Sequence, residues 1–163
     1  MKKKIISLTA VAIVLLMLVF TFPCFAETDL KKTTRTGIIG AMDEEVNSLK
    51  EALDEKRINT IAGMEFCEGK LDGADVVVVK CSVGKVNAAA CTQILIDRFE
   101  VDQIINTGVA GSLDAAIDIG DIVVSTEAVQ HDMDVTALGY TRGEIPYSEK
   151  SVFPADFRRD VLC

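Results

Sequence analysis

Three short segments carry residues that could do chemistry at a small-molecule site. Glu44 and Glu45 follow a short apolar run, Ser82–Lys85 combines a glycine with a lysine, and Thr107–Ser112 holds two glycines in a Gly-x-x-Gly spacing. A carboxylate can take a proton from water, and glycines let backbone N–H groups approach a ligand closely. Neither glycine segment has the spacing of a P-loop. Taken singly, these patterns more often mark a helix start or a tight turn than a site.

The one histidine of the chain, His131, stands close to Asp132 and Asp134. Such a group could suggest a metal site or an acid–base pair, although a single histidine among acids is more often a loop or interface contact. The cysteines do not strengthen a metal site, because they form no Cys-x-x-Cys pair and no cluster with His131. Spacing alone therefore predicts no metal ligand.

Four cysteines follow the N-terminal segment: Cys67, Cys81, Cys91 and Cys163. In an exported protein they permit three disulfide pairings, and their spacing does not choose among these. The first three lie in apolar segments, which favours buried free thiols that act as small hydrophobic side chains.

The elements that would position the three segments alternate between strands and helices. Gly37–Met42 is an apolar run that predicts a buried strand, and Asp43 is a candidate N-cap for a following helix. The apolar face of that helix is expected to contain Val46, Leu49 and Leu53. Ligands collect at the carboxyl ends of strands in open α/β sheets, which is where Glu45 would then lie.

Further along, apolar runs and turn residues predict more strands and two more helices. Strands are expected over Asn59–Glu68, Val76–Val79, Gln103–Asn106 and Ile122–Ser125, with a tight turn at Asp72-Gly73. A helix is expected from Val86 to Phe99 with Val86, Ala90 and Ile94 on one face, a long polar loop from His131 to Pro146, and a last helix from near Pro154. The alternation predicts an α/β fold with a central mixed, largely parallel sheet flanked by helices.

The N-terminal segment has the composition of an export signal. Lys2–Lys4 are followed by the apolar run Ile5–Phe22 and by Cys24-Phe25-Ala26, which suits a signal peptidase. Residues 5–22 are also long enough to span a bilayer, so an N-terminal anchor stays open beside cleavage after Ala26. We therefore expect a signal peptide or anchor over 1–26, a linker over 27–36, and an exported domain over 37–163.

The charge of the chain excludes one class of partner. The 163 residues carry 17 basic and 25 acidic side chains, and leaving out the three leader lysines gives a formal charge of −11 for the rest. Nucleic-acid backbones are bound by clustered Lys and Arg, so nucleic acid is not expected as a partner. Contact with a membrane is expected only through the N-terminal segment.

Four longer strings go beyond these general patterns. They follow one another in the order and at the spacing seen in one enzyme family. The strings are Gly37–Val46, Ser82–Ala89, Ile104–Ser112 with Gly120–Ser125, and His131–Tyr140. In these strings the chain closely resembles the bacterial 5′-methylthioadenosine/S-adenosylhomocysteine nucleosidases, and the resemblance covers Gly37 to about Pro146.

The resemblance implies a nucleoside phosphorylase-like fold and a purine nucleoside as substrate. This family hydrolyses the N-glycosidic bond between adenine and a 5′-thio-substituted ribose, without cofactor or metal. Glu45 matches the glutamate that positions and deprotonates the attacking water. The substrate-binding matches are Met42 beside the ribose, Val83 as an apolar wall, Gly111 with its backbone against the purine, and Val109 where some members have serine.

The resemblance also implies a homodimer. Val135, Leu138 and Pro146 match residues that reach across the dimer interface and close the 5′-thioalkyl pocket of the neighbouring subunit. Leu138 replaces an aromatic residue there.

One part of the family's site is not matched. Adenine leaves only when protonated at N7, and the family uses an Asp near its C-terminus for this, with a Met-Glu pair that holds the ribose hydroxyls. Cys163 precedes the positions of both motifs. We therefore expect a fold that is incomplete at its C-terminus and a chain with little or no activity. The alternatives are a nucleoside phosphorylase, a non-catalytic nucleoside-binding module, and a truncated product that does not fold stably.

Overall fold

The computed structural model describes residues 34–156. The predicted leader, residues 27–33 of the predicted linker, and Cys163 lie outside these residues. The chain divides into two compact units, one ending at Val109 and one beginning at Ala110, and each is described by itself.

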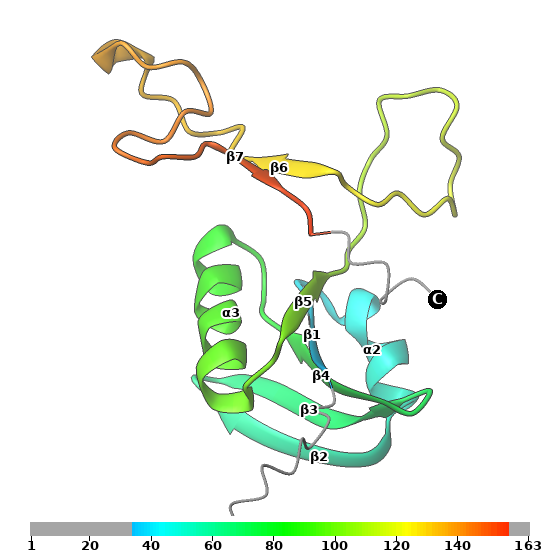
Figure 1. Ribbon diagram of the computed structural model, residues 1–163. Helices are drawn as coiled ribbons and strands as arrows, with labels where there is room; N and C mark the ends of the chain where they lie inside the picture. Colours follow the sequence, from blue (N-terminus) through cyan, green and yellow to red (C-terminus); the bar gives the residue numbers. More distant parts are fainter. Residues whose placement is uncertain (1–33, 157–163) are drawn as a thin grey trace, which may run out of the picture. The chain divides into compact units, whose positions relative to one another are not determined.

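The first unit is built on a five-stranded sheet with strand order β2-β3-β4-β1-β5 (Figure 1). The strands are β1 (Arg35–Gly40), β2 (Asp54–Ile61), β3 (Met64–Leu71), β4 (Ala74–Lys80) and β5 (Gln103–Asn106). β1 runs parallel to both β4 and β5, whereas β2, β3 and β4 pair antiparallel in sequence order. The predicted mixed sheet is confirmed, and its parallel part consists of β4, β1 and β5.

Two tight turns shape the antiparallel part. The turn at Asp72-Gly73 is confirmed, with both residues at positive φ and β3 pairing β4 up to Leu71 and Ala74. The single strand predicted over Asn59–Glu68 is wrong, because the chain reverses at Ala62-Gly63 and the two halves pair as β2 and β3. Ala62 adopts φ 51°, a left-handed conformation that alanine rarely adopts, so the pair Ala62-Gly63 does not predict a turn.

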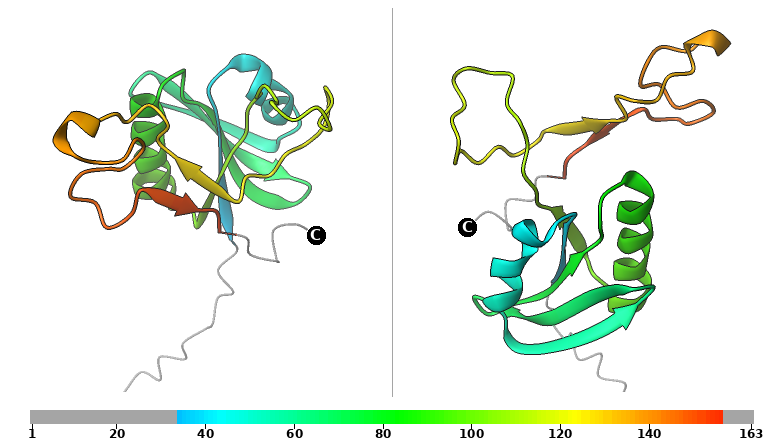
Figure 2. Two further views of the ribbon diagram at one scale, coloured as in Figure 1. Left: turned by 90° about the horizontal axis from the view of Figure 1, so that it is seen from above. Right: turned by 180° about the vertical axis from the view of Figure 1, so that it is seen from behind.

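The two helices, α2 (Asp43–Glu51) and α3 (Lys85–Phe99), cover opposite faces of this sheet (Figures 1 and 2). Val77 and Val79 pack with residues of α3, and Val76 and Val78 pack with Val46 of α2. Successive side chains of a strand point to opposite faces, so a run of four valines is needed to fill both cores. The strand predicted over Val76–Val79 is confirmed, and all four valines are buried.

The face of α3 that packs on the sheet differs from the prediction. Cys91, Leu95 and Phe99 are buried, whereas Val86 and Ala90 are exposed. Both sets follow the same four-residue spacing, and they lie in neighbouring rows of one helix surface. Periodicity alone could not choose between the two rows, because this helix carries apolar residues on more than one side.

The buried thiols match the expectation for small hydrophobic side chains. Cys67, Cys81 and Cys91 are free and buried. Burial and the nearby Cys81 raise the pKa of Cys91 to about 12, so this thiol stays protonated. Within residues 34–156, the helices are too short or too polar to cross a bilayer.

The second unit contains little regular structure. Its strands β6 (Glu127–Val129) and β7 (Val152–Pro154) pair antiparallel, and a 3-10 turn, η1, spans Thr136–Leu138. The strand predicted over Ile122–Ser125 is wrong, since these residues form no strand and Ile122, Val123 and Val124 are exposed. An apolar run favours a strand only where other residues cover it. The helix predicted to begin near Pro154 is also wrong at its start, because Pro154 ends β7.

Replacing Leu95 by alanine tests which row of α3 faces the core. Leu95 is fully buried, so Leu95→Ala is expected to lower the free energy of unfolding by about 2–5 kcal/mol. Ile96→Ala is the control, because Ile96 is half exposed, and it is expected to cost less than about 1 kcal/mol. Urea unfolding followed by circular dichroism measures both, and equal losses would contradict the assignment.

Candidate active site

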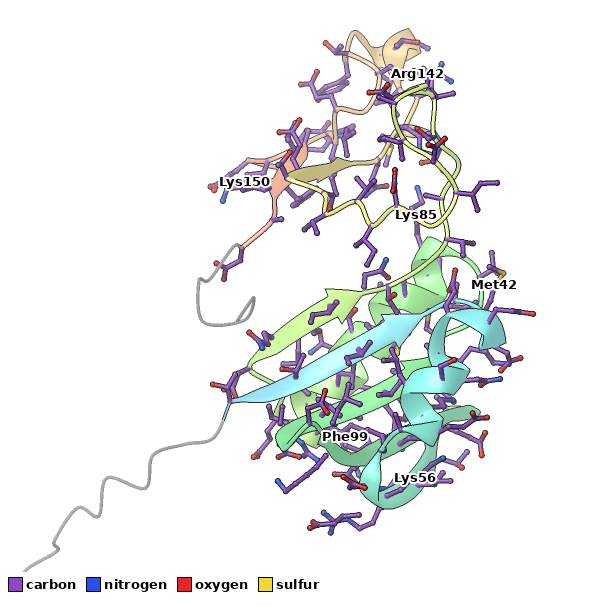
Figure 3. All side chains as sticks on the ribbon, turned by 90° about the vertical axis from the view of Figure 1, so that its right-hand side faces the viewer. Met42, Lys56, Lys85, Phe99, Arg142 and Lys150 are labelled. Atoms are coloured by element: carbon purple, nitrogen blue, oxygen red, sulfur yellow. The ribbon has the colours of Figure 1, made fainter. Side chains whose placement is uncertain are left out.

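The three segments singled out for chemistry begin at one edge of the first unit's sheet. Because β4, β1 and β5 are parallel, the loops after Lys80, Gly40 and Asn106 leave the sheet on the same side. Two backbone bonds continue this pairing beyond the strands: Cys81 donates to Gly40 (2.9 Å) and Thr107 donates to Ile39 (2.9 Å). Figure 3 shows Met42 and the start of α3 at Lys85 toward this end of the unit, and Phe99 toward the other end.

Glu45 binds two of these loops through its carboxylate. The backbone N–H groups of Ala41 and Met42 donate to Oε2 at 2.6 and 3.0 Å. The N–H of Val109 donates to Oε1 at 3.1 Å. The carboxylate thus joins the loop after β1 to the loop after β5, and three backbone donors hold it in place.

These hydrogen bonds decide the charge of Glu45. The N–H donors of Val109 and Met42, with that of Ala41, lower the pKa of the carboxyl below its ordinary value, and partial desolvation opposes them only in part. Glu45 is therefore ionised at neutral pH. The negative charge also reaches Cys81, whose thiol pKa is raised mainly by burial and additionally by Glu45.

Two glycines leave the space that Glu45 occupies. A Cβ at Gly40 would lie 2.5 Å from Cγ1 of Val46 and 3.0 Å from Cβ of Glu45. A Cβ at Gly108 would lie 3.0 Å from Oε1 of Glu45. From the sequence, Gly108 is expected only to let backbone N–H groups approach a ligand closely. In the structure, both glycines leave room for the protein's own carboxylate.

The start of α2 is set by residues around Glu45. Met42 is the N-cap in extended conformation, and Asp43 is the first helical residue, so the prediction of Asp43 as N-cap is wrong by one position. The carboxylate of Asp43 instead pairs with Lys80 at the end of β4 (Nζ–Oδ2 2.7 Å). Val46 is fully buried one residue after Glu45. These contacts fix the first turn of α2 against the sheet.

The structure brings three predicted substrate-binding residues to the same edge as Glu45. Met42, Val83 and Val109 lie in the loops after β1, β4 and β5, and all three side chains are exposed. The loop of Val83 has a defined shape, because the Asn87 side chain donates to the Val83 carbonyl at 2.8 Å. Ser82 holds φ 68° in the same loop. Apolar side chains around one carboxylate suit a ligand with both a ring and polar groups.

The other predicted site residues belong to the second unit. Gly111, Val135, Leu138 and Pro146 all follow Ala110 and lie in that unit. Leu138 is exposed at the end of η1, and Val135 is the residue before it. Their roles at a substrate or dimer interface stay predictions.

Asp134, one of the two acids near His131, has a local structural role in this unit. Asp134 accepts hydrogen bonds from the hydroxyl (2.8 Å) and the N–H (3.2 Å) of Thr136, which lower the pKa of its carboxyl. Arg142 lies 3.7 Å from its other oxygen. Within the described part of the chain, no group of three or more His, Cys, Asp and Glu residues is placed to hold a metal ion.

Comparison with known proteins gives consistent matches. The sequence model described as the phosphorylase superfamily matches residues 35–160. A 5′-methylthioadenosine/S-adenosylhomocysteine nucleosidase of Colwellia psychrerythraea is 51% identical over 122 residues, which are 75% of this chain and 50% of that protein. The chain thus spans about half the length of the curated relatives that it matches.

Solved structures agree with this result. The Colwellia psychrerythraea nucleosidase in complex with adenine matches with a TM-score of 0.71 at 50% identity, over 76% of this chain and 50% of that chain. The Neisseria meningitidis nucleosidase in complex with methylthio-immucillin-A matches with a TM-score of 0.71 at 37% identity, over 76% of this chain and 53% of that chain.

The titration of Glu45 tests the three backbone hydrogen bonds. Carbon-13 NMR of the side-chain carboxyl is expected to show a lower pKa in the folded chain than in the same chain unfolded in urea. Because the folded-state pKa is the lower one, the charge of Glu45 stabilises the fold above its unfolded-state pKa. This contribution is lost as the pH falls through the folded-state pKa. Equal pKa values in both states would rule out the hydrogen-bonded carboxylate.

Proposed function

The chain belongs to the phosphorylase superfamily, and from this membership we propose that it supplies the water-activating part of a nucleosidase site. The reaction is hydrolysis of the N-glycosidic bond of 5′-methylthioadenosine and S-adenosylhomocysteine, which releases adenine. Relatives that match this chain bear the name of that nucleosidase. The observation that carries the proposal is the ionised carboxylate of Glu45, held by three backbone N–H groups at the sheet edge.

The charge of Glu45 suits this chemistry. Glycosidic cleavage passes through an oxocarbenium-like transition state, so a carboxylate beside the sugar stabilises the positive charge that develops. Water adds to C1′ of the ribose, and its proton passes to the Glu45 carboxylate. The adenine leaves with a proton that a second acid must supply at N7. Glu45 therefore accounts for the proton taken from water, but not for the proton added to N7.

The position of Glu45 supports the same conclusion. Its three donors are backbone groups of loops that extend the parallel strands, so the carboxylate is held without depending on a flexible partner side chain. A pre-positioned charge needs no reorganisation when the transition state forms. Met42, Val83 and Val109 would offer apolar contact to the ribose and its 5′-thio substituent.

The weak activity expected for the 163-residue chain remains part of the proposal. Glu45 would activate water, whereas the resemblance assigns no residue of this chain to the family's acid for N7 or to its Met-Glu pair. We therefore propose that the chain binds a purine nucleoside with little or no turnover. Homodimerisation through Val135, Leu138 and Pro146 is proposed on the family resemblance alone.

Export is proposed from the composition of residues 1–26. Three lysines, an apolar run and a peptidase-like site support a signal peptide, and the length of the run from 5 to 22 also supports an anchor. A domain outside the cytoplasm would act on external nucleosides and release adenine for uptake.

A nucleoside phosphorylase is the second candidate, because the superfamily name includes such enzymes. Phosphorolysis needs a cradle for a phosphate anion, in which cations and N–H donors are favourable. At this edge the N–H groups of Ala41, Met42 and Val109 already bind the carboxylate of Glu45, and Glu44 adds negative charge. The negative charge favours water over phosphate as the attacking group.

Replacing Glu45 by glutamine tests the proposed water activation. Glu45→Gln keeps the shape of the side chain but removes the base, so any adenine release from 5′-methylthioadenosine that the chain catalyses is expected to fall to the rate without protein. Glu44→Gln is the matched control, because Glu44 lies on the same turn with an exposed side chain, and its rate is expected to equal that of the unchanged chain. A coupled assay for free adenine measures both. Calorimetric binding of the nucleoside, with no adenine release above the rate without protein in the unchanged chain, would instead support a non-catalytic binding module.

Phosphate dependence separates the two candidate reactions. Adenine release by the unchanged chain is expected to be the same with and without added phosphate, with the free thio-sugar as the second product. Release that requires phosphate, together with a sugar 1-phosphate detected by phosphorus-31 NMR, would establish the phosphorylase instead.

A further inference from the structure

Asp43 and Lys80 make a contact beside the candidate site that the proposed reaction does not use directly. The Lys80 ammonium lies 2.7 Å from Oδ2 of Asp43. Lys80 is the last residue of β4, and Asp43 is the first residue of α2. Asp43 precedes Glu45 by two positions, so this ion pair acts on the helical turn that carries the candidate water-activating group.

The start of α2 has an unusual N-cap. The N-cap residue is Met42, whose thioether is a weak hydrogen-bond acceptor, whereas strong N-caps have a hydroxyl, amide or carboxylate oxygen. The carboxylate of Glu45 accepts the N–H of Met42 instead. Because Glu45 both caps the helix and serves as the candidate base, a contact that holds this turn in place also holds the carboxylate.

The order of the strands explains how the turn is held on two sides. β1 lies between β4 and β5, and α2 is the next element after β1. Successive helical residues are about 100° apart, so side chains two positions apart point to roughly opposite sides of a turn. Asp43 reaches the end of β4 through Lys80. Glu45 reaches the loop after β5 through the N–H of Val109, and these opposed contacts resist rotation of the turn about the helix axis.

The apolar packing of α2 does not fix this rotation by itself. Val46 is fully buried against the sheet and keeps the helix close to it. An apolar contact is not directional, so Val46 determines the distance of the turn from the sheet better than its rotation. The backbone bond from Cys81 to Gly40 (2.9 Å) joins the ends of β4 and β1. Lys80 therefore has a fixed base from which it holds Asp43.

We propose that Lys80 is a positioning residue, which through Asp43 orients the first turn of α2 so that the Glu45 carboxylate meets the N–H groups of both loops. The two side chains of the ion pair are 37% and 56% exposed, and exposed pairs add little to global stability. The effect of the pair is therefore expected at Glu45 rather than in unfolding. The inference rests on the proposed function only in taking Glu45 as the water-activating group.

The carboxyl pKa of Glu45, followed by carbon-13 NMR in the 163-residue chain, tests this role. Lys80→Met removes the positive charge of the pair, and Asp43→Ala removes the negative charge. If the two residues acted on Glu45 only as charges, the first change would raise its pKa and the second would lower it. Loss of orientation weakens the N–H bonds to Glu45 in both variants, so its pKa is expected to rise in both.

Amide hydrogen exchange provides a second readout. The N–H of Val109 donates to Oε1 of Glu45, so its exchange is expected to quicken roughly two- to fivefold in Lys80→Met and in Asp43→Ala. Lys80→Arg keeps the charge and is expected to retain the exchange rate and the Glu45 pKa of the unchanged chain. Lys50→Met is the matched control, because Lys50 lies in the last turn of the same helix, and it is expected to change neither quantity.

Unaltered exchange in β1 and β4 shows that a variant keeps the first unit folded. The proposal is overturned by a Glu45 pKa that stays the same or falls in Asp43→Ala, or by unchanged Val109 exchange in both variants. Equal effects of Lys50→Met and Lys80→Met overturn it as well, and so does loss of the whole fold in both variants, because the pair would then be a general stability contact.

These measurements need no substrate, so they separate the positioning role from the proposed function. The expected changes at Glu45, in a chain that neither binds nor cleaves 5′-methylthioadenosine, would count against the proposed function and leave the positioning role supported. Adenine release that depends on Glu45 but is the same in Lys80→Met and in the unchanged chain, together with an unchanged Glu45 pKa, would leave the function standing and refute the positioning role.

Discussion

The hydrogen bonds between Glu45 and the backbone N–H groups of Ala41, Met42 and Val109 are the interaction on which the candidate site depends. They join the loop after β1 to the loop after β5, and they keep the carboxylate ionised. Gly40 and Gly108 leave room for this contact, since a Cβ at either position would press on the Glu45 side chain or its neighbour. The charge that the proposed reaction needs is thus a consequence of how the strand ends are joined.

The sheet carries this arrangement because both of its faces are packed. Ile38 and Ile39 alternate between the two hydrophobic clusters, as the valines of β4 do, so α2 and α3 are each held against one face. Packing of Val46 places the first turn of α2 beside the carboxyl end of β1. The second unit has no comparable packing within itself, and its large apolar side chains are exposed.

The sequence predicts local structure best where the residue types favour a single conformation or a single degree of burial. Asp72-Gly73 suits a tight turn with two positive φ values, and four consecutive valines suit a strand covered on both sides. Ala62-Gly63 makes a similar turn without a typical turn pair, so the sequence predicts one continuous strand where the structure has a hairpin. The strand predicted over Ile122–Ser125 failed for a different reason, because its apolar residues have no cover in the structure.

By itself, the sequence determined the mixed α/β fold, the family resemblance and the choice of Glu45, since these follow from patterns and strings within short stretches. Only the tertiary structure decided that Val109, 64 residues further along the chain, donates to Glu45, and that Cys91 and Leu95 rather than Val86 face the core. Contacts between distant segments depend on strand order and on helix rotation, and neither is encoded in local periodicity.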